Sequence, residues 1–158
     1  MPEDTFYIEE AEVDEKNIIT WNHELEQERK SAVFDLTNNC YFKLNKDITG
    51  PYRIKIKFEE WKLFLFIKDS KDDKEYEKKY LVRSIRRIVR DYQIVCENYV
   101  EAIKTAPLKK IEAIDIGRRS IHDEGAETLK ELLEKNITLD MDTARRLFTL
   151  ISIISIKI

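Results

Sequence analysis

Residues 50–68 read GPYRIKIKFEEWKLFLFIK, and this stretch decides the fold class. From Tyr52 to Phe58, apolar side chains alternate strictly with charged ones, which predicts a strand with one buried face and one solvated face. The next run, 61–68, is almost continuously apolar and predicts a central strand. A weaker strand at 76–81 completes a small antiparallel sheet over residues about 50–82. We expect three to four strands, because residues 5–13 carry a short alternation typical of an edge strand.

From Val82 onward the hydrophobic period changes to that of helices. Apolar side chains from Ile85 to Ile103 share one face and predict a long helix, which Pro107 ends. Upstream of the sheet, Asn22 is a suitable N-cap for a helix that runs to about Leu36. Because the strands cluster first and most helices follow, the pattern predicts an α+β fold with four to five helices packed against the sheet.

The last third of the chain predicts three further helices. We expect one helix from Leu108 to Gly117, a second from an N-cap at Ser120 to Asn136, and a final helix capped by Asp140 or Asp142. The final helix is nearly all apolar after Leu147, and a helix that is apolar all round must be buried. Two interpretations stay open for this buried C-terminal helix: it is the core of the domain, or it is the seam of a homodimer.

Length and composition limit the class of protein. The chain has 158 residues, of which 42% are apolar, and this suits a single domain over residues 1–158. It has no apolar run long enough to span a membrane, and its start lacks the pattern of a secretory leader. Cys40 and Cys96 are too few for a disulfide framework. These features predict a cytoplasmic protein with reduced thiols and no membrane partner.

Charge is unevenly distributed along the chain. Residues 1–28 hold ten acids and one base, a net −9, whereas residues 29–158 hold 21 acids and 27 bases, a net +6. We expect the acidic N-terminal segment, residues 1–20, to be only partly ordered. It is either a solvated segment or an arm that lies over a basic surface and screens it. A sequence pI of about 5.6 argues against a dedicated nucleic-acid binder.

Arginine pairs are the most unusual chemical feature. Eight of the ten arginines lie between residues 83 and 146, and six of them form the pairs Arg86-Arg87, Arg118-Arg119 and Arg145-Arg146. A guanidinium grips a carboxylate or phosphate with two parallel hydrogen bonds, which lysine cannot reproduce. The arginines therefore pair with acids of neighbouring helices, or they bind an anionic ligand.

The stretch 117–125, GRRSIHDEG, brings two of these arginines next to His122. Ser120 with Asp123 resembles a capping box, which would aim free backbone N–H groups and two guanidinium groups at one small volume. His122 is then a candidate general acid or base, or else a turn histidine bonded to a carboxylate. An anion pocket here requires that no protein carboxylate fills the space. The candidate ligand-binding residues are Arg118, Arg119, Ser120, Arg145, Arg146, Arg86 and Arg87.

Three functions follow from these residues. The first is binding of a small anion or phosphate ligand by the Arg-Arg/His cluster at a helix–helix junction. The second is a non-catalytic homodimeric interaction module, and the third is nucleic-acid binding by the Arg83–Arg90 helix face with Tyr92 as a stacking ring. The third is the weakest, because residues 83–119 carry nine bases and five acids, a net of only +4. No metal-ligand spacing, Gly-rich phosphate loop or catalytic motif is present, so we predict no metal or cofactor and leave open whether the protein is an enzyme.

Three long runs in the second half resemble a known family. They are RRIVRDY at 86–92, IEAIDIGRR at 111–119 and DTARRLFTL at 142–150, and the shorter stretches AVFDL at 32–36 and GPY at 50–52 are also similar to it. The family is uncharacterised protein family 0262, a group of small bacterial proteins, and the resemblance extends over nearly the whole chain from about residue 25. It implies a bacterial cytoplasmic protein and brings no activity, cofactor or catalytic residue.

Overall fold

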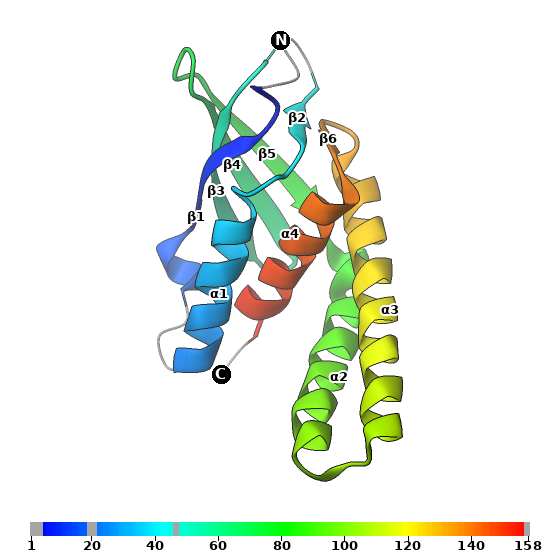
Figure 1. Cartoon of the computed structure of the whole chain (residues 1–158). Coiled ribbons are helices and arrows are strands. Elements are labelled where there is room, and N and C mark those ends of the chain that lie inside the picture. The colour runs from blue at the N-terminus through cyan, green and yellow to red at the C-terminus, as the bar shows by residue number, and fades with distance from the viewer. Residues whose placement is uncertain (1–4, 19–21, 46–47, 157–158) are drawn as a thin grey trace.

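The computed structural model describes residues 5–18, 22–45 and 48–156. In these residues the chain forms a four-stranded sheet, a separate two-stranded sheet and four α-helices (Figure 1). The strands are β1 (Ile8–Val13), β2 (Phe42–Leu44), β3 (Tyr52–Glu59), β4 (Lys62–Asp69), β5 (Glu75–Leu81) and β6 (Ile137–Leu139). The helices are α1 (His23–Asp35), α2 (Arg86–Thr105), α3 (Leu108–Leu133) and α4 (Met141–Ile154), with single 3₁₀ turns η2 (Glu15–Asn17) and η3 (Arg83–Ile85).

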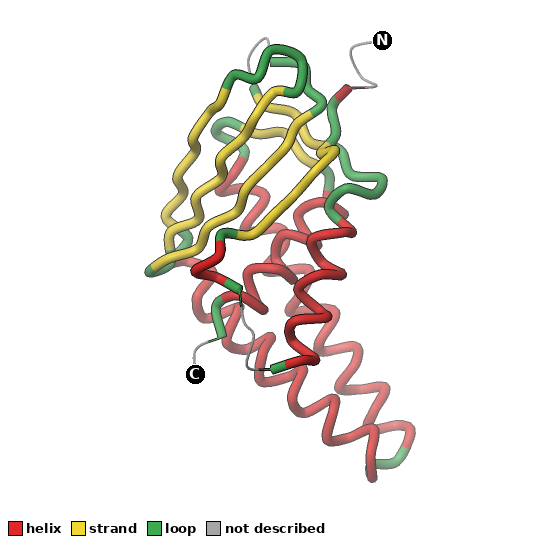
Figure 2. The backbone as a smooth tube through the Cα atoms, turned by 90° about the vertical axis from the view of Figure 1, so that its left-hand side faces the viewer, coloured by secondary structure: helices red, strands yellow, loops and turns green. Residues whose placement is uncertain are grey.

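The larger sheet has the strand order β1-β3-β4-β5. Its three later strands are antiparallel neighbours, as the alternation predicted, but β1 pairs in parallel with β3, so the sheet is mixed. The side chains that the pattern predicted to be inward, from Tyr52 to Phe58 at every second position, are buried. In Figure 2 the four strands lie in front and no helix crosses them, so the helices cover one face of the sheet only.

Helix α4 lies at the centre of the molecule and contacts α1, α2 and α3 (Figure 1). Every residue from Leu147 to Ile154 except Thr149 is buried, and most of their side chains belong to the same hydrophobic core as the inner face of the sheet. The interpretation of α4 as the core helix of the domain is therefore confirmed. Its N-cap is Asp140, which accepts a hydrogen bond from the backbone N–H of Thr143 at 3.0 Å.

The prediction of two helices between Leu108 and Asn136 is wrong, because α3 is one continuous helix. Gly117 and Ser120 lie in its interior, where Ser120 is exposed and caps nothing. An interior glycine costs about 1 kcal/mol relative to alanine, and the apolar stripe that α3 packs against α2 and α4 outweighs this cost. The free backbone N–H groups expected at this position are consequently absent from it.

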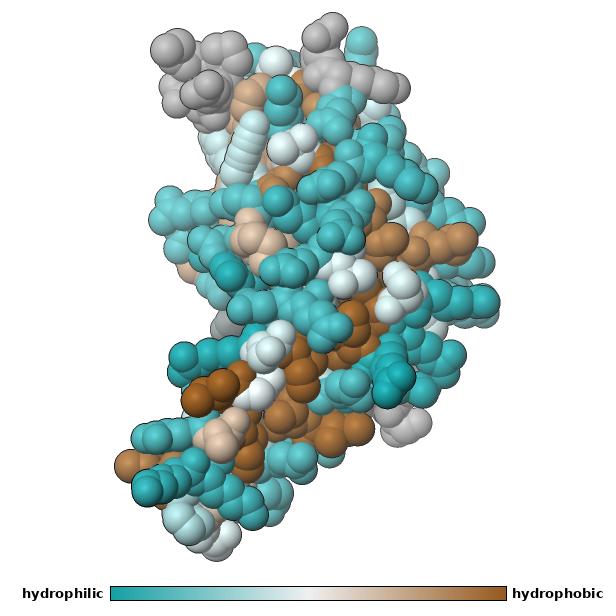
Figure 3. Space-filling model, turned by 90° about the vertical axis from the view of Figure 1, so that its right-hand side faces the viewer, coloured by the Kyte–Doolittle hydropathy of each residue, from teal (hydrophilic) through white to brown (hydrophobic). Residues whose placement is uncertain are grey.

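Helices α2 and α3 form a long hairpin that extends beyond the end of α4 (Figure 1). Over this extension they pack mainly against each other, and apolar side chains run along the hairpin between polar flanks (Figure 3). The most exposed large apolar residues of the two helices are Ile94, Val100, Ile103, Leu108 and Ile116. Within the described residues, no helix is long and apolar enough to cross a bilayer.

Candidate functional site

A cavity of about 350 Å³ lies where α2, α3 and α4 meet. Six residues from the three helices line it: Tyr92, Arg118, Arg119, His122, Asp123 and Arg145. The contact between α3 and α4 brings Arg145 to the stretch around His122, although the two are far apart in sequence. Four of the site residues expected from the sequence therefore share one cavity.

A single carboxylate orients two of the guanidinium groups. Asp115 accepts from Nε of Arg118 at 3.1 Å and, through its other oxygen, from Nη2 of Arg119 at 2.5 Å. Hydrogen bonding from Arg118 is the main cause that holds the pKa of Asp115 below its ordinary value. Arg118 also lies over the ring of Tyr99, with 4.7 Å between the guanidinium carbon and the ring centroid. Asp115 does not line the cavity, so it binds the guanidinium groups of Arg118 and Arg119 from outside the lining.

The third guanidinium, that of Arg145, is held by two carboxylates. Its Nε donates to Asp123 and its Nη1 donates to Asp142, each at 3.0 Å. Asp123 lines the cavity, and half of its side chain is exposed. The anion pocket required that Arg118 and His122 converge and that no carboxylate fill the space. Arg118 and His122 do line the same cavity, but the carboxylate of Asp123 lines it as well, so the requirement is only partly met.

His122 is packed among aromatic rings and hydrogen-bonded to α4. Its ring centroid lies 5.1 Å from that of Tyr92 and 5.4 Å from that of Phe148. Its Nε2 lies 2.7 Å from Oγ1 of Thr149, and this hydroxyl donates to the carbonyl of Arg145 at 3.1 Å. We assign the imidazole proton to Nε2 on this basis, because Thr149 then accepts from His122 while its own hydroxyl donates to Arg145. Nδ1 then presents a lone pair.

Burial sets the protonation states around His122. Desolvation lowers the pKa of His122 below its ordinary 6.5, the nearby charges of Arg145 and Arg118 lower it further, and Asp123 opposes them. Desolvation also raises the pKa of Tyr92 and of the Cys96 thiol. At neutral pH the imidazole is therefore neutral while the phenol and the thiol keep their protons, so His122 lines the cavity as a neutral base beside the Asp123 carboxylate.

The lowered pKa of His122 predicts a loss of stability on acidification. The unfolded chain takes up this proton near pH 6.5 and the folded chain only at lower pH, so the free energy of unfolding falls as the pH drops from 6.5 through the folded pKa. We expect His122→Gln, which keeps an N–H donor, to flatten this slope between about pH 7 and pH 5 in urea unfolding. His23→Gln, at the exposed start of α1, is the matched control substitution. An unchanged slope in His122→Gln would contradict the buried neutral imidazole.

The remaining candidate residues lie outside the cavity lining. Arg146 donates from Nη1 to the carbonyl oxygens of Asp35 and Asn38, the first at 2.7 Å, and lies 2.8 Å from the Cys40 sulfur. It thus satisfies carbonyls at the C-terminal end of α1. Arg86 and Arg87 are exposed at the start of α2, where Arg86 lies over the Trp61 ring. Ser120 is exposed on α3.

Sequence reasoning assigned Tyr92 to a different function and missed the role of Thr149. The signal for Thr149 was present in the polar positions 149, 152 and 155, which are spaced by three in an otherwise apolar helix. This stripe faces the two other helices of the site: Thr149 binds His122, and the side-chain amide of Gln93 donates to the hydroxyl of Ser155 at 3.2 Å. A polar stripe on a buried helix indicates that buried polar partners lie opposite it.

Comparison with known proteins places the chain in a family. The model of the uncharacterised protein family UPF0262 matches residues 6–157. The chain belongs to this family. A UPF0262 protein of Cereibacter sphaeroides is 42% identical over 148 residues, covering 90% of this chain and 94% of the relative. UPF0262 proteins of Paramagnetospirillum magneticum and Rhodospirillum rubrum are 40% and 41% identical, over 95% and 96% of this chain and 96% and 93% of their own lengths.

The family confirms the resemblance and adds no activity. Its description and the names of these UPF0262 relatives state no ligand or reaction, so the chemistry of the site has to be argued from its own residues. No solved structure matches this chain. Among the described residues no group of histidine, cysteine and acidic side chains could hold a metal ion.

Proposed function

We propose that this UPF0262 protein binds a small anionic ligand in the cavity between α2, α3 and α4. The observation that carries the proposal is the convergence of three guanidinium groups, from two helices, on the wall that also holds His122. Each of these arginines is held by a carboxylate, and this fixes its planar fork before a ligand arrives. Preorganised donors bind an anion at a smaller entropic cost than mobile ones.

The arginines retain donors for a ligand. A guanidinium has five N–H donors, of which Arg118 uses those on Nε and Nη2, and Arg119 uses Nη2 alone. Within the described part of the chain, no carboxylate or carbonyl accepts from Nη1 of either residue, and Tyr92 is a further polar neighbour of Arg118.

Asp123 narrows the class of ligand. Three positive charges and one negative charge line the cavity, and Asp115 and Asp142 outside the lining balance the total. A bare anion therefore gains little from net charge. An anion that also carries a hydroxyl or ammonium group gains more, because it donates to Asp123 or to Nδ1 of His122 while its charge meets Arg118 and Arg119. We expect a phosphomonoester or carboxylate with a neighbouring donor.

A thermal-shift series tests the proposal. The ligands are inorganic phosphate, methyl phosphate and glycerol phosphate, of which only the last adds hydroxyl groups. A ligand at 100 times its Kd adds about 2.7 kcal/mol of stability, which for a chain of this size raises Tm by roughly 5–11 °C. We expect the largest rise with glycerol phosphate, and we expect Arg118→Ala to abolish it.

Arg87→Ala is the matched control, since it removes an exposed arginine outside the cavity. The quantity compared is the ligand-induced rise in Tm, because Arg118→Ala also removes the contacts with Asp115 and Tyr99 and lowers the starting Tm. Loss of the rise in Arg87→Ala, or an equal rise in Arg118→Ala and wild type, would contradict binding in this cavity.

A further inference from the structure

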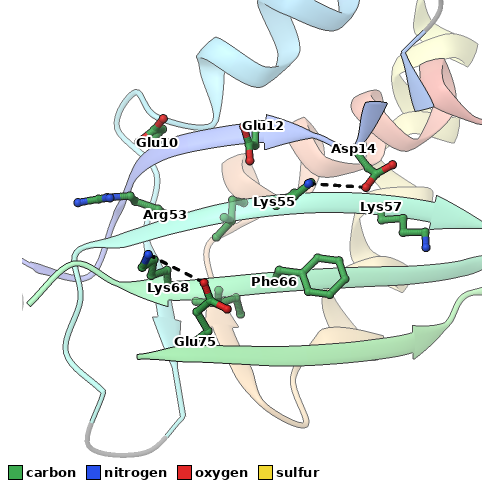
Figure 4. A pocket seen from close by; sticks show the side chains of 11 residues that line it. Glu10, Glu12, Asp14, Arg53, Lys55, Lys57, Phe66, Lys68 and Glu75 are labelled. Carbon is green, nitrogen blue, oxygen red and sulfur yellow. Dashed lines mark ion pairs between the residues drawn. The ribbon is translucent and has the colours of Figure 1, made fainter. Parts of the chain in front are cut away.

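The outer face of the four-stranded sheet is a second surface with organised chemistry. Its side chains form rows along the strands, and a hollow of about 510 Å³ lies over β1, β3 and β4 (Figure 4). The row on β3 is basic, with Arg53, Lys55 and Lys57, and the row on the other central strand, β4, contains Phe64 and Phe66 between Lys62 and Lys68. Two aromatic rings thus stand next to each other in the middle of an uncovered sheet.

Lysines flank the two rings through the strand register. Phe64 pairs with Lys57 on β3 and with Lys79 on β5, and Phe66 pairs with Lys55 on β3. The ammonium groups of Lys57 and Lys79 lie 5.4 and 5.8 Å from the Phe64 ring centroid, so the face of this ring is directed toward cations. Both phenylalanines are half-buried, because the stems of such flanking lysines cover aromatic surface while their charges stay in water.

Acidic residues are confined to the borders of this basic and aromatic centre. They lie on the outer strands β1 and β5 and at the end of β3, and they are Glu9, Glu10, Glu12, Glu59, Glu75 and Glu77, with Asp14 just beyond β1. The ion pairs that they make with the central cations are partly exposed and mostly long: 3.4 Å for Arg53–Glu9, 3.8 Å for Lys55–Asp14, 3.6 Å for Lys57–Glu59 and 3.9 Å for Lys68–Glu75. Exposed ion pairs contribute little to stability, so a phosphate group can replace them.

We propose that this face binds a short single strand of nucleic acid, with bases stacked on Phe64 and Phe66 and phosphates held by the flanking lysines. Proteins that bind single strands combine aromatic side chains on an open sheet with cations that follow the backbone. Phe64 and Phe66 are two residues apart on β4, which separates their Cα atoms by roughly 7 Å, about twice the ~3.4 Å rise per nucleotide of a duplex strand, and this suits unstacked bases. The acidic borders keep the contact to a few nucleotides along β3 and β4. This inference is independent of the cavity between the helices.

Fluorescence anisotropy with short labelled oligonucleotides tests the inference. The probes are single-stranded RNA, single-stranded DNA of the same sequence, and the corresponding duplex. We expect the single strands to bind, with an affinity that falls as salt rises, and the duplex to bind more weakly. The RNA and DNA arms show whether the 2′-hydroxyl contributes.

Two substitutions isolate the stacking. Phe64→Ala with Phe66→Ala should raise the Kd about five- to 150-fold per ring, the range that stacking of one base supplies. Phe64→Leu with Phe66→Leu keeps apolar side chains on the strand but removes the aromatic faces. We expect this pair to raise the Kd by the same factor as the alanine pair. Lys57→Gln with Lys79→Gln should weaken binding and reduce its salt dependence, whereas the matched charge change at Lys109 and Lys110, at the tip of the hairpin, should not.

Three results would overturn the inference. They are an unchanged Kd in both phenylalanine pairs, equal affinity for single strand and duplex, and the absence of binding by any oligonucleotide. Binding of a labelled acidic peptide with the same dependence on Phe64 and Phe66, and no binding of nucleic acid, would assign the face to a protein partner instead.

Discussion

Replacing Phe148 with alanine is expected to lower the free energy of unfolding by about 3–5 kcal/mol. Phe148 is fully buried in α4, and its ring contacts those of Tyr92 and His122 at centroid distances of 5.6 and 5.4 Å. Truncation removes the transfer energy of the ring and leaves a cavity among three helices that cannot close independently, because each also packs elsewhere. Urea unfolding followed by circular dichroism measures the change.

Phe34→Ala is the control for this substitution, since it makes the same chemical change on the exposed side of α1. Phe34 is 66% exposed, and we expect its truncation to change the free energy of unfolding by no more than about 0.5 kcal/mol. Similar effects of the two substitutions would mean that Phe148 does not organise the junction of α2, α3 and α4.

The second large effect is expected at Gly125, where α3 crosses α4. A Cβ built at this position would overlap Cε1 and Cζ of the Phe148 ring, far inside van der Waals contact, and this ring is fully buried. Gly125→Ala should therefore force the helices apart and cost about 1–3 kcal/mol, even though alanine is the better helix former. The close approach of α3 to α4 also allows the hydrogen bond between His122 and Thr149. We therefore expect the same substitution to weaken ligand binding in the cavity.

Gly117→Ala provides a matched comparison with the opposite sign. Gly117 lies in the same helix, and a Cβ there would meet nothing within 4 Å. The substitution should stabilise the protein by about 0.5–1 kcal/mol through helix propensity alone. Destabilisation by Gly117→Ala, or stabilisation by Gly125→Ala, measured as Tm and urea midpoint, would contradict the packing of α3 described above.

The sheet could be predicted from the sequence where its pattern is local. The alternation from Tyr52 to Phe58 records which side of β3 faces the core, and the apolar run at 61–68 marks the adjacent strand. The pairing of β2 with β6 had no such signal. Each of these strands has three residues, too few to establish a period, and they come from distant parts of the chain.

The prediction of a helix boundary between Gly117 and Ser120 is wrong for a physical reason. Local signals for a helix end compete with the apolar stripe that continues along α3, and burial of that stripe against α2 and α4 contributes more than one cap. Because no helix begins at Ser120, the site has no free backbone N–H groups from a helix N-terminus. The guanidinium groups are then the donors that would bind an anion.

Both members of each arginine pair were candidate ligand-binding residues, and the cavity is lined by both members of one pair and by one member of another. A helix turns by about 100° per residue, so neighbouring side chains point in different directions. Arg145 consequently faces the cavity while Arg146 faces α1. Arg118 and Arg119 both line the cavity, since Asp115 lies three and four residues before them and draws both side chains toward one side of α3.

An NMR titration of the two histidine side chains with glycerol phosphate tests directly whether an anion binds between α2, α3 and α4. The chain has only His23 and His122, so their imidazole signals can be assigned with one substitution. A ligand in the cavity predicts a saturable shift of the His122 signals, none at His23, and loss of the shift in Arg118→Ala. Signals of both histidines that move together in proportion to ionic strength, or a His122 signal that does not move, would contradict an anion site between α2, α3 and α4.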